Sequence, residues 1–279
     1  MDKDNKYGFK KTQKTLLEMM KKIDQKFSEK NIFYLFIYGS ALGAVRDKGF
    51  IPWDDDIDIA VLREDTSRVE AALEELEYFY EPCEKHLLPS APIMHISSVK
   101  KEDIGPEFNI KNHPEIDIWI IDRVPQNTIK RKIARITGLE HDFFTYRQAP
   151  STRGAFVNKA FSFLLNHLSE KTMNRLQEKT LGRLLRLGRN EEYVTEAYHI
   201  KHFRVYERSF LTDSVRIPFE DMLVPVPRDY DRYLTIVYGD YMTPPPESPN
   251  VNSSYGKKRK KKNSGTAITY DTRIPDHHS

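Results

Sequence analysis

Hydrophobic and polar residues follow both helical and strand-like patterns along the chain. Between residues 12 and 30 apolar residues recur every three or four positions, which predicts an amphipathic helix with one buried face. Residues 32–38 are continuously apolar and predict a strand buried on both faces. A second helix is predicted to begin at Asp65, just before another apolar stripe. The two stripes are Leu16, Met20, Ile23 and Phe27, and Val69, Ala72, Leu73 and Leu76.

Further strands are predicted at residues 56–61, 89–100 and 116–122, because isoleucine and valine dominate them. Residues 123–189 have a mostly helical pattern that is rich in lysine and arginine. Within this part, the apolar face of residues 157–168 predicts a core helix, with contact to a membrane surface as the alternative. The pattern therefore predicts an α+β fold, a mixed sheet flanked by helices and with helical additions, in one domain over residues 1–250.

Aspartates interrupt two of the predicted strands. In a strand, side chains two positions apart point to the same face, so Asp56 and Asp58 are expected side by side while Ile57 and Ile59 enter the core. Adjacent buried carboxylates repel each other, and a divalent cation is the usual compensation. Oxygen ligands of this kind suit Mg²⁺, or Mn²⁺ in its place. Asp122, near the end of residues 116–122, is expected on the opposite face from Asp117, as a cap for the next segment.

Gly39 and Ser40 follow the first predicted strand and indicate a turn into a helix over residues 42–46. The first N–H groups of a helix have no partner within the helix, and they favour an anion. Arg46 would add a planar fork of donors suited to phosphate, with an ion pair to a carboxylate as the alternative. A phosphate-binding turn beside paired carboxylates is typical of phosphoryl transfer.

These motifs resemble the nucleotidyltransferase superfamily, and in particular its LicD branch, which is related to fukutin. The resemblance is carried by GSALGAVR at residues 39–46, FIPWDDDIDI at residues 50–59 and the later aspartate Asp117. Weaker matches follow at Phe219-Glu220 and at residues 224–246. The resemblance implies a nucleotidyltransferase-like mixed sheet in which Asp56, Asp58 and Asp117 are catalytic and bind the metal.

The same resemblance implies the activity. Members of the branch transfer phosphocholine from CDP-choline to a sugar hydroxyl of a teichoic acid, a lipopolysaccharide or a similar glycan, and release CMP. Gly39, Ser40 and Arg46 would then bind the donor, and Asp117 is a candidate acceptor of the incoming hydroxyl's proton. A choline cation favours aromatic faces. Trp53 is assigned to the substrate site on that ground, and four further candidates are Trp119, Tyr206, Tyr230 and Tyr238.

Two alternatives remain open. One is an enzyme with the same fold that transfers a nucleoside monophosphate or a polyol phosphate. The other is a catalytically silent scaffold that binds a glycan or a nucleotide. The scattered histidines, including His95 and His141, show no metal-ligand spacing and are interpreted as ordinary polar or core residues.

Charge is distributed unevenly along the 279 residues. Residues 251–279 carry a net +5 through the basic run at 257–262, so the rest carries −2 of the total of +3. This tail is expected to be disordered, with attraction to an anionic membrane as the functional alternative. The body gives no reason to expect nucleic-acid binding. With the one cysteine Cys83 and no signal-peptide core, we expect a cytoplasmic protein, with peripheral attachment to the inner face of the membrane left open.

Overall fold

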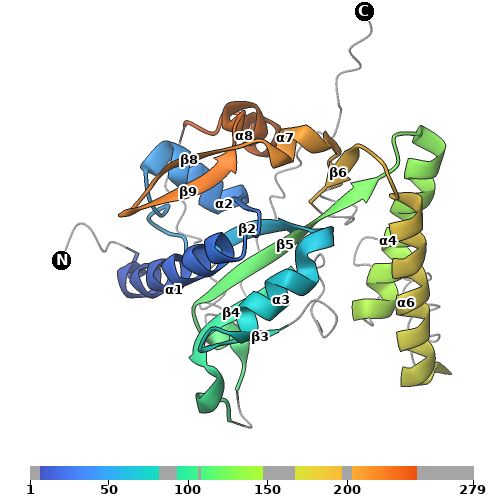
Figure 1. The fold of residues 1–279 in the computed structure, drawn as a ribbon, viewed down its shortest axis with the longest axis horizontal. Helices are drawn as coiled ribbons and strands as arrows, with labels where there is room; N and C mark the ends of the chain where they lie inside the picture. The colour runs from blue at the N-terminus through green and yellow to red at the C-terminus, as the bar shows by residue number, and fades with distance from the viewer. Residues whose placement is uncertain (1–6, 82–92, 106–107, 147–166, 197–202, 244–279) are drawn as a thin grey trace, which may run out of the picture.

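The computed structural model describes residues 7–81, 93–105, 108–146, 167–196 and 203–243. The predicted α+β fold is confirmed, since a mixed sheet is flanked by helices (Figure 1). The helices are α1 (Lys10–Glu29), α2 (Tyr38–Leu42), α3 (Thr66–Glu74), α4 (Thr128–Tyr146), α6 (Glu170–Leu187), α7 (Arg208–Thr212) and α8 (Tyr230–Tyr238). The strands are β1 (Tyr34–Phe36), β2 (Asp56–Leu62), β3 (Tyr78–Glu81), β4 (Ile93–Lys100), β5 (Glu115–Val124), β6 (Tyr193–Thr195), β7 (Tyr206–Glu207), β8 (Ser214–Phe219) and β9 (Met222–Pro227).

The main sheet has the strand order β1-β2-β5-β4-β3. β2 and β5 are parallel, whereas the pairs β1–β2, β5–β4 and β4–β3 are antiparallel. Parallel neighbours cannot be joined by a tight turn. The chain therefore forms α3, β3 and β4 before β5 returns beside β2. β6 pairs with the last residues of β5, and β7 pairs with β6.

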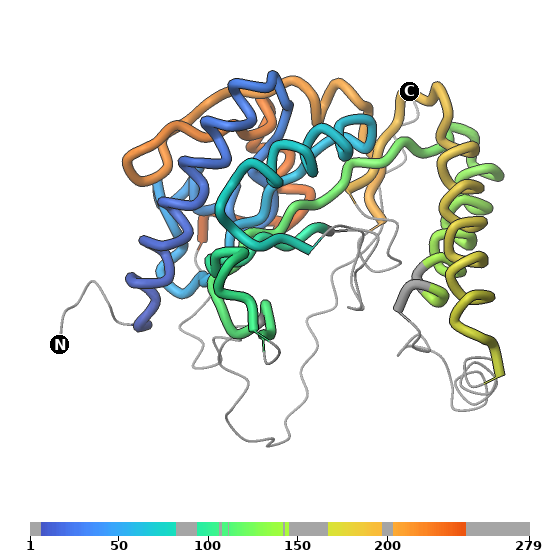
Figure 2. Tube along the Cα trace, turned by 60° about the horizontal axis from the view of Figure 1, so that its bottom comes forward, coloured from blue at the N-terminus to red at the C-terminus, as the bar shows by residue number. Residues whose placement is uncertain are grey.

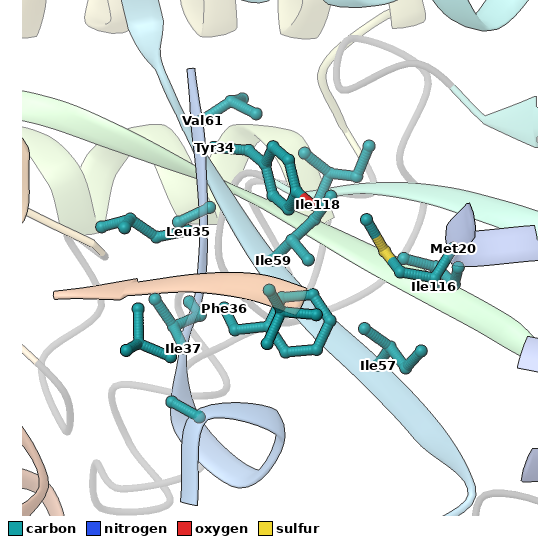
Figure 3. Close-up of a cluster of buried hydrophobic side chains, with 14 of the residues drawn as sticks. Met20, Tyr34, Leu35, Phe36, Ile37, Ile57, Ile59, Val61, Ile116 and Ile118 are labelled. Carbon is teal, nitrogen blue, oxygen red and sulfur yellow. The ribbon is translucent and has the colours of Figure 1, made fainter. Parts of the chain in front are cut away.

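The isoleucines of the two parallel strands form the centre of the core. They are fully buried, and Figure 3 shows them gathered with side chains of α1 and β1. A fully buried isoleucine contributes about 1.5–3 kcal/mol to folding. The stripe predicted for α1 is confirmed, and the predicted burial of the first strand is confirmed for Tyr34–Phe36. The residues in the centre are Met20, Tyr34, Phe36, Ile57, Ile59, Ile116 and Ile118.

The β8–β9 hairpin holds the loop that leads into β2. Phe219 is buried, with its ring centroid 5.2 Å from that of Phe36 and 4.8 Å from that of Phe50. Next to it, the carboxylate of Glu220 accepts a hydrogen bond from the N–H of Phe50 (3.1 Å), and the N–H of Glu220 donates to the carbonyl of Lys48 (2.9 Å). The Phe-Glu pair near the end of the chain thus positions residues 48–50, just before the aspartates.

Helices α4 and α6 pack against each other beside the sheet, as both Figure 1 and Figure 2 show. A small apolar cluster that includes Val124, Ala134 and Leu184 joins them to the end of β5. These helices confirm the predicted helical additions, although the apolar residues 157–166 lie outside the described part of the chain. The basic tail at 251–279 also lies outside it. In the described part, no helix has both the length and the apolar character needed to cross a bilayer.

Two local predictions were wrong. The helix after β1 begins at Tyr38 rather than at residue 42, so Gly39 and Ser40 lie in its first turn. A π-helical turn, Gly43–Asp47, follows it directly. The second wrong prediction is that Asp122 caps the segment after its strand, because no such contact is present in the described part of the chain. Asp122 is buried and accepts two hydrogen bonds from the guanidinium of Arg63, at 2.7 and 2.8 Å. A buried carboxylate needs such a partner.

Gly43 permits a close backbone approach, which yields a first prediction. A Cβ atom at this position would lie 2.5 Å from the carbonyl oxygen of Gly49 and 3.3 Å from the nitrogen of Ile51. Because both contacts are backbone atoms, Gly43→Ala must displace the loop before β2, and we expect a loss of about 1–3 kcal/mol in the free energy of unfolding. The matched control is Gly182→Ala, in the middle of α6, where the nearest atom is a flexible arginine nitrogen at 3.7 Å. It should be stabilising by up to about 1 kcal/mol.

Urea denaturation of both variants measures the difference. Equal stability of Gly43→Ala and wild type would mean that the loop can move at no cost.

Candidate active site

The register of β2 and β5 brings two of the predicted aspartates together. Asp58 is the direct neighbour of Asp117 across the parallel pair, and Asp56 is the neighbour of Glu115. Adjacent strands lie about 4.8 Å apart. All four side chains are on the face opposite the buried isoleucines Ile57 and Ile59, so the predicted division of β2 between its two faces is confirmed.

Asp54 and Asp55 extend this group of carboxylates. One oxygen from each of Asp54, Asp55 and Asp56 lies within 4.8 Å of the others. Burial raises the pKa of Asp54 well above its usual range, and the charges of Asp56, Asp58 and Asp55 raise it further. Burial is also the main cause that raises the pKa of Asp56 to about 6. Burial and mutual repulsion thus both act against the charged form of these carboxylates.

Asp58 is in a similar position. Burial, followed by the charges of Asp56 and Asp117, raises its pKa well above the usual range. Its Oδ1 accepts a hydrogen bond of 2.8 Å from the indole N–H of Trp119, which favours the ionised form. The donor set around Asp58 is therefore made of carboxylate oxygens under mutual repulsion. This set fits a hard divalent cation such as Mg²⁺.

His95 contacts Asp117 from the other neighbouring strand. It is the direct partner of Asp117 in the antiparallel β4–β5 register, and its Nδ1 is in hydrogen-bond contact with Oδ1 of Asp117. The same Nδ1 lies 3.8 Å from Oε2 of Glu115. With a carboxylate as partner, Nδ1 is the protonated nitrogen and donates the bond. His95 is buried, so a core position is confirmed, but it is in contact with a site residue.

Trp119 and Tyr38 form an aromatic pair next to Asp58. Their ring centroids are 5.0 Å apart and the rings are nearly perpendicular. Tyr38 has a φ of +45°, a left-handed conformation that is strained for a bulky residue. Its N–H donates to the hydroxyl of Tyr233 (3.3 Å), and the preceding N–H, that of Ile37, donates to the carbonyl of Asp58 (3.1 Å). These contacts hold the strained junction between β1 and α2.

The first turn of α2 lies directly against β2. The hydroxyl of Ser40 accepts a hydrogen bond of 2.8 Å from the N–H of Asp58, and its own proton can still be donated. A Cβ atom at Gly39 would lie 2.9 Å from Oδ2 of Asp54, so the glycine leaves room for that carboxylate. The motif residues Gly39 and Ser40 therefore lie beside the carboxylates, as the sequence predicted, but within a helical turn.

Arg46 forms an ion pair with a carboxylate, which was the alternative to phosphate binding. Its guanidinium bonds the carboxylate of Asp47 at 2.8 Å and the carbonyl of Tyr241 at 3.3 Å, and only 7% of the side chain is exposed. We expect Arg46→Lys to lower stability by about 1–3 kcal/mol, through lost charged hydrogen bonds, more than it alters the donor KM. Thermal unfolding and donor titration measure the two effects. A strongly raised KM with unchanged stability would instead support the predicted role of Arg46 in binding the donor phosphates.

The aromatic candidates lie in different environments. Trp53 is half-buried, and its ring meets that of Tyr7 edge-on at 5.7 Å. Tyr206 is buried in the core and stacks on Phe210 at 5.5 Å. Burial, followed by the charges of Asp58 and Asp54, raises the pKa of Tyr238 above its usual range.

Four residues of this site were missed by sequence reasoning: Asp54, Asp55, His95 and Glu115. Glu115 could have been predicted from the alternation of side chains along a strand, because it lies two positions before Asp117 and on the same face. Asp54 lies before β2, where no periodicity applies. His95 is 22 positions from Asp117 and meets it only through the register of β4 and β5. No pattern in the sequence indicates that register.

A family model matches the part of the chain that contains the carboxylate site. Residues 31–149 match the family model described as LicD/FKTN/FKRP, nucleotidyltransferase domain. These residues therefore resemble the nucleotidyltransferase domain of the LicD family, as the motifs indicated. The core extends beyond the matched residues, because α1 and the β8–β9 hairpin pack into it.

Three known proteins match parts of the chain of different length. Over 221 residues the chain is 26% identical to the lipopolysaccharide cholinephosphotransferase LicD of Haemophilus influenzae, which covers 75% of this chain and 82% of that protein. It is also 38% identical over 63 residues to an uncharacterised protein of Rickettsia prowazekii, 23% of this chain and 24% of that protein. A protein of Rickettsia typhi is 43% identical over 51 residues, 18% of this chain and 16% of that protein.

Proposed function

We propose that the protein transfers phosphocholine from CDP-choline to a sugar hydroxyl of a cell-surface glycan precursor, such as a teichoic acid or a lipopolysaccharide, and releases CMP. The observation that carries this proposal is the direct neighbourhood of Asp58 and Asp117 on one polar face, within the residues that match the LicD family model. The similarity to a lipopolysaccharide cholinephosphotransferase over most of the chain supports the choice of donor and acceptor.

In this proposal Asp56, Asp58 and Asp117 hold one or two Mg²⁺ ions, or Mn²⁺ in their place. The carboxylate oxygens and their mutual repulsion support this assignment. A bound ion of this kind neutralises charge that develops on the transferred phosphoryl group and on its leaving group. Without such an ion, the crowded carboxylates would repel the donor's phosphates.

The residues of the chain then have separate roles. Gly39 and Ser40 hold the donor phosphates, with the Ser40 proton available for a phosphate oxygen. Asp117, held by His95, accepts the proton of the acceptor hydroxyl. The sugar oxygen bonds to the choline-side phosphorus, the bond from that phosphorus to the bridging oxygen breaks, and CMP leaves. Trp53 is proposed to contact the donor.

Phosphorus NMR of the full chain with CDP-choline, Mg²⁺ and a lipopolysaccharide or teichoic acid preparation tests the proposal. We expect CMP to appear together with a new phosphodiester signal on the acceptor. Pyrophosphate from a parallel incubation with CTP would instead identify a nucleotidyl transferase. Binding of CDP-choline without any product would identify a silent scaffold.

Attachment to the membrane is proposed for the basic run at residues 257–262, which would bring a cytoplasmic enzyme to the inner face of the membrane. Each basic residue near an anionic surface contributes about 1 kcal/mol, screened over about 8 Å at physiological salt. We expect truncation after Asn250 to weaken pelleting with phosphatidylglycerol vesicles at low salt and to leave activity on a small soluble acceptor intact. If the truncated and full-length proteins pellet equally, the basic run does not attach the protein to the membrane.

A further inference from the structure

Helix α4 exposes an apolar stripe outside its contact with α6. Ile129, Ile133 and Ile136 are 71%, 45% and 58% exposed. They are three of the seven large apolar side chains that are exposed in the described part of the chain. Spacings of four and three residues place all three on one face of a helix. Leaving that much apolar surface in water is unfavourable unless the face has a partner.

A different face of α4 packs against α6. Ala134 and Thr137 are buried there. His141 contacts the carbonyl of Gln177 at 3.2 Å and the hydroxyl of Thr180 at 3.1 Å, both on α6. The isoleucine stripe is thus not the face that joins the two helices. Figures 1 and 2 both show the pair at one side of the molecule, beside the sheet.

Positive charge borders the stripe. Residues 128–136 contain Lys130, Arg131, Lys132 and Arg135 and no acidic residue. Lys130 and Lys132 are both exposed, one on each side of the stripe. The arginines are engaged within the molecule, since Arg131 donates to the carbonyls of Pro125 and Gln126 and Arg135 lies over the ring of Phe203. An apolar face bordered by lysine is the pattern of helices that lie in the interface of an anionic bilayer. A two-fold contact with a second copy of the chain would instead bring the same lysines together, which is unfavourable.

We propose that the first turns of α4 dock on an anionic lipid surface, with Ile129, Ile133 and Ile136 inserted among the acyl chains and the flanking lysines at the lipid phosphates. This contact does not depend on the proposed reaction, nor on the basic tail. It holds the α4–α6 side of the molecule against the membrane.

Vesicle sedimentation of the full-length protein is the first test. The variant combines Ile129→Ser, Ile133→Ser and Ile136→Ser, and the matched control combines Leu223→Ser, Ile236→Ser and Met242→Ser, which are 53%, 44% and 57% exposed elsewhere. With vesicles of phosphatidylglycerol and phosphatidylcholine at physiological salt, we expect the α4 variant to partition at least about tenfold less than wild type. The control should partition like wild type. Equal partition of the α4 variant and wild type would overturn the proposal.

A fluorescent probe reports the contact separately from the tail. In a Cys83→Ser background, an environment-sensitive dye on Ile133→Cys should shift to shorter wavelength when phosphatidylglycerol vesicles are added. The same dye on Ile236→Cys should not shift. Combining Lys130→Gln and Lys132→Gln should reduce this fluorescence shift. Because these two side chains are exposed, this variant still tests the proposal if the triple serine variant is unfolded at room temperature. The absence of a fluorescence shift at position 133 would overturn the proposal. So would a dimer of the wild-type protein that forms without lipid and that the triple serine variant does not form.

Discussion

Replacing Asp58 by asparagine should abolish transfer and at the same time stabilise the metal-free fold. The variant lacks a carboxylate that we propose as a metal ligand, so we expect the rate to fall on the order of 10²-fold or more. The repulsion that Asp56 and Asp117 exert on Asp58 is lost as well. Asparagine keeps an oxygen in place for the indole N–H of Trp119, so the side chain has no reason to leave its position.

Thermal unfolding with EDTA and with Mg²⁺ separates the two effects. In EDTA the Asp58→Asn protein should melt above wild type. Addition of Mg²⁺ should raise the melting temperature of wild type, since a ligand at 100 times its Kd adds about 2.7 kcal/mol. The variant should gain little. Asp221→Asn, which breaks only an exposed pair with Lys21, is the control and should behave like wild type in both respects. Normal turnover by Asp58→Asn, or by wild type in excess EDTA, would remove Asp58 from the site.

A second large effect is expected at His95. Its contact with Asp117 orients that carboxylate, and partners that orient a metal-binding side chain typically matter by about 10- to 100-fold in affinity or activity. His95→Leu keeps the buried volume but loses the donor, so activity and Mg²⁺ affinity should both fall by that factor. His95→Asn places an amide donor near the position of Nδ1 and should recover most of the loss.

The comparison of the two His95 variants distinguishes orientation from packing. Leucine and asparagine differ in volume, so the melting temperatures of the two variants are measured together with kcat and the Mg²⁺ concentration at half-saturation. If His95→Leu and His95→Asn lose the same activity, the histidine acts through packing alone. If neither loses any, the contact with Asp117 has no role in the reaction.

Local patterns predicted the strand faces correctly, because the alternation of Asp56, Ile57, Asp58 and Ile59 reflects a geometry that each strand has on its own. The proximity of Asp58 and Asp117 came only from the family resemblance, since no periodicity tells which strands are neighbours. The start of α2 was missed for a different reason. Gly39 and Ser40 favour a turn by propensity, but tertiary contacts hold Tyr38 in a left-handed conformation and let the helix begin there.

The parallel pairing of β2 and β5 also limits how this chain can vary in length. A one-residue insertion or deletion within either strand reverses every side chain beyond it, so that an aspartate would enter the core and an isoleucine the polar face. Between Leu62 and Glu115, by contrast, the pairing requires only that the chain returns in the same register. Extra residues in a surface loop cost little, about 0.6 kcal/mol for each doubling of loop length. Length changes should therefore accumulate in the connections of this domain, while the two strands keep a constant number of residues.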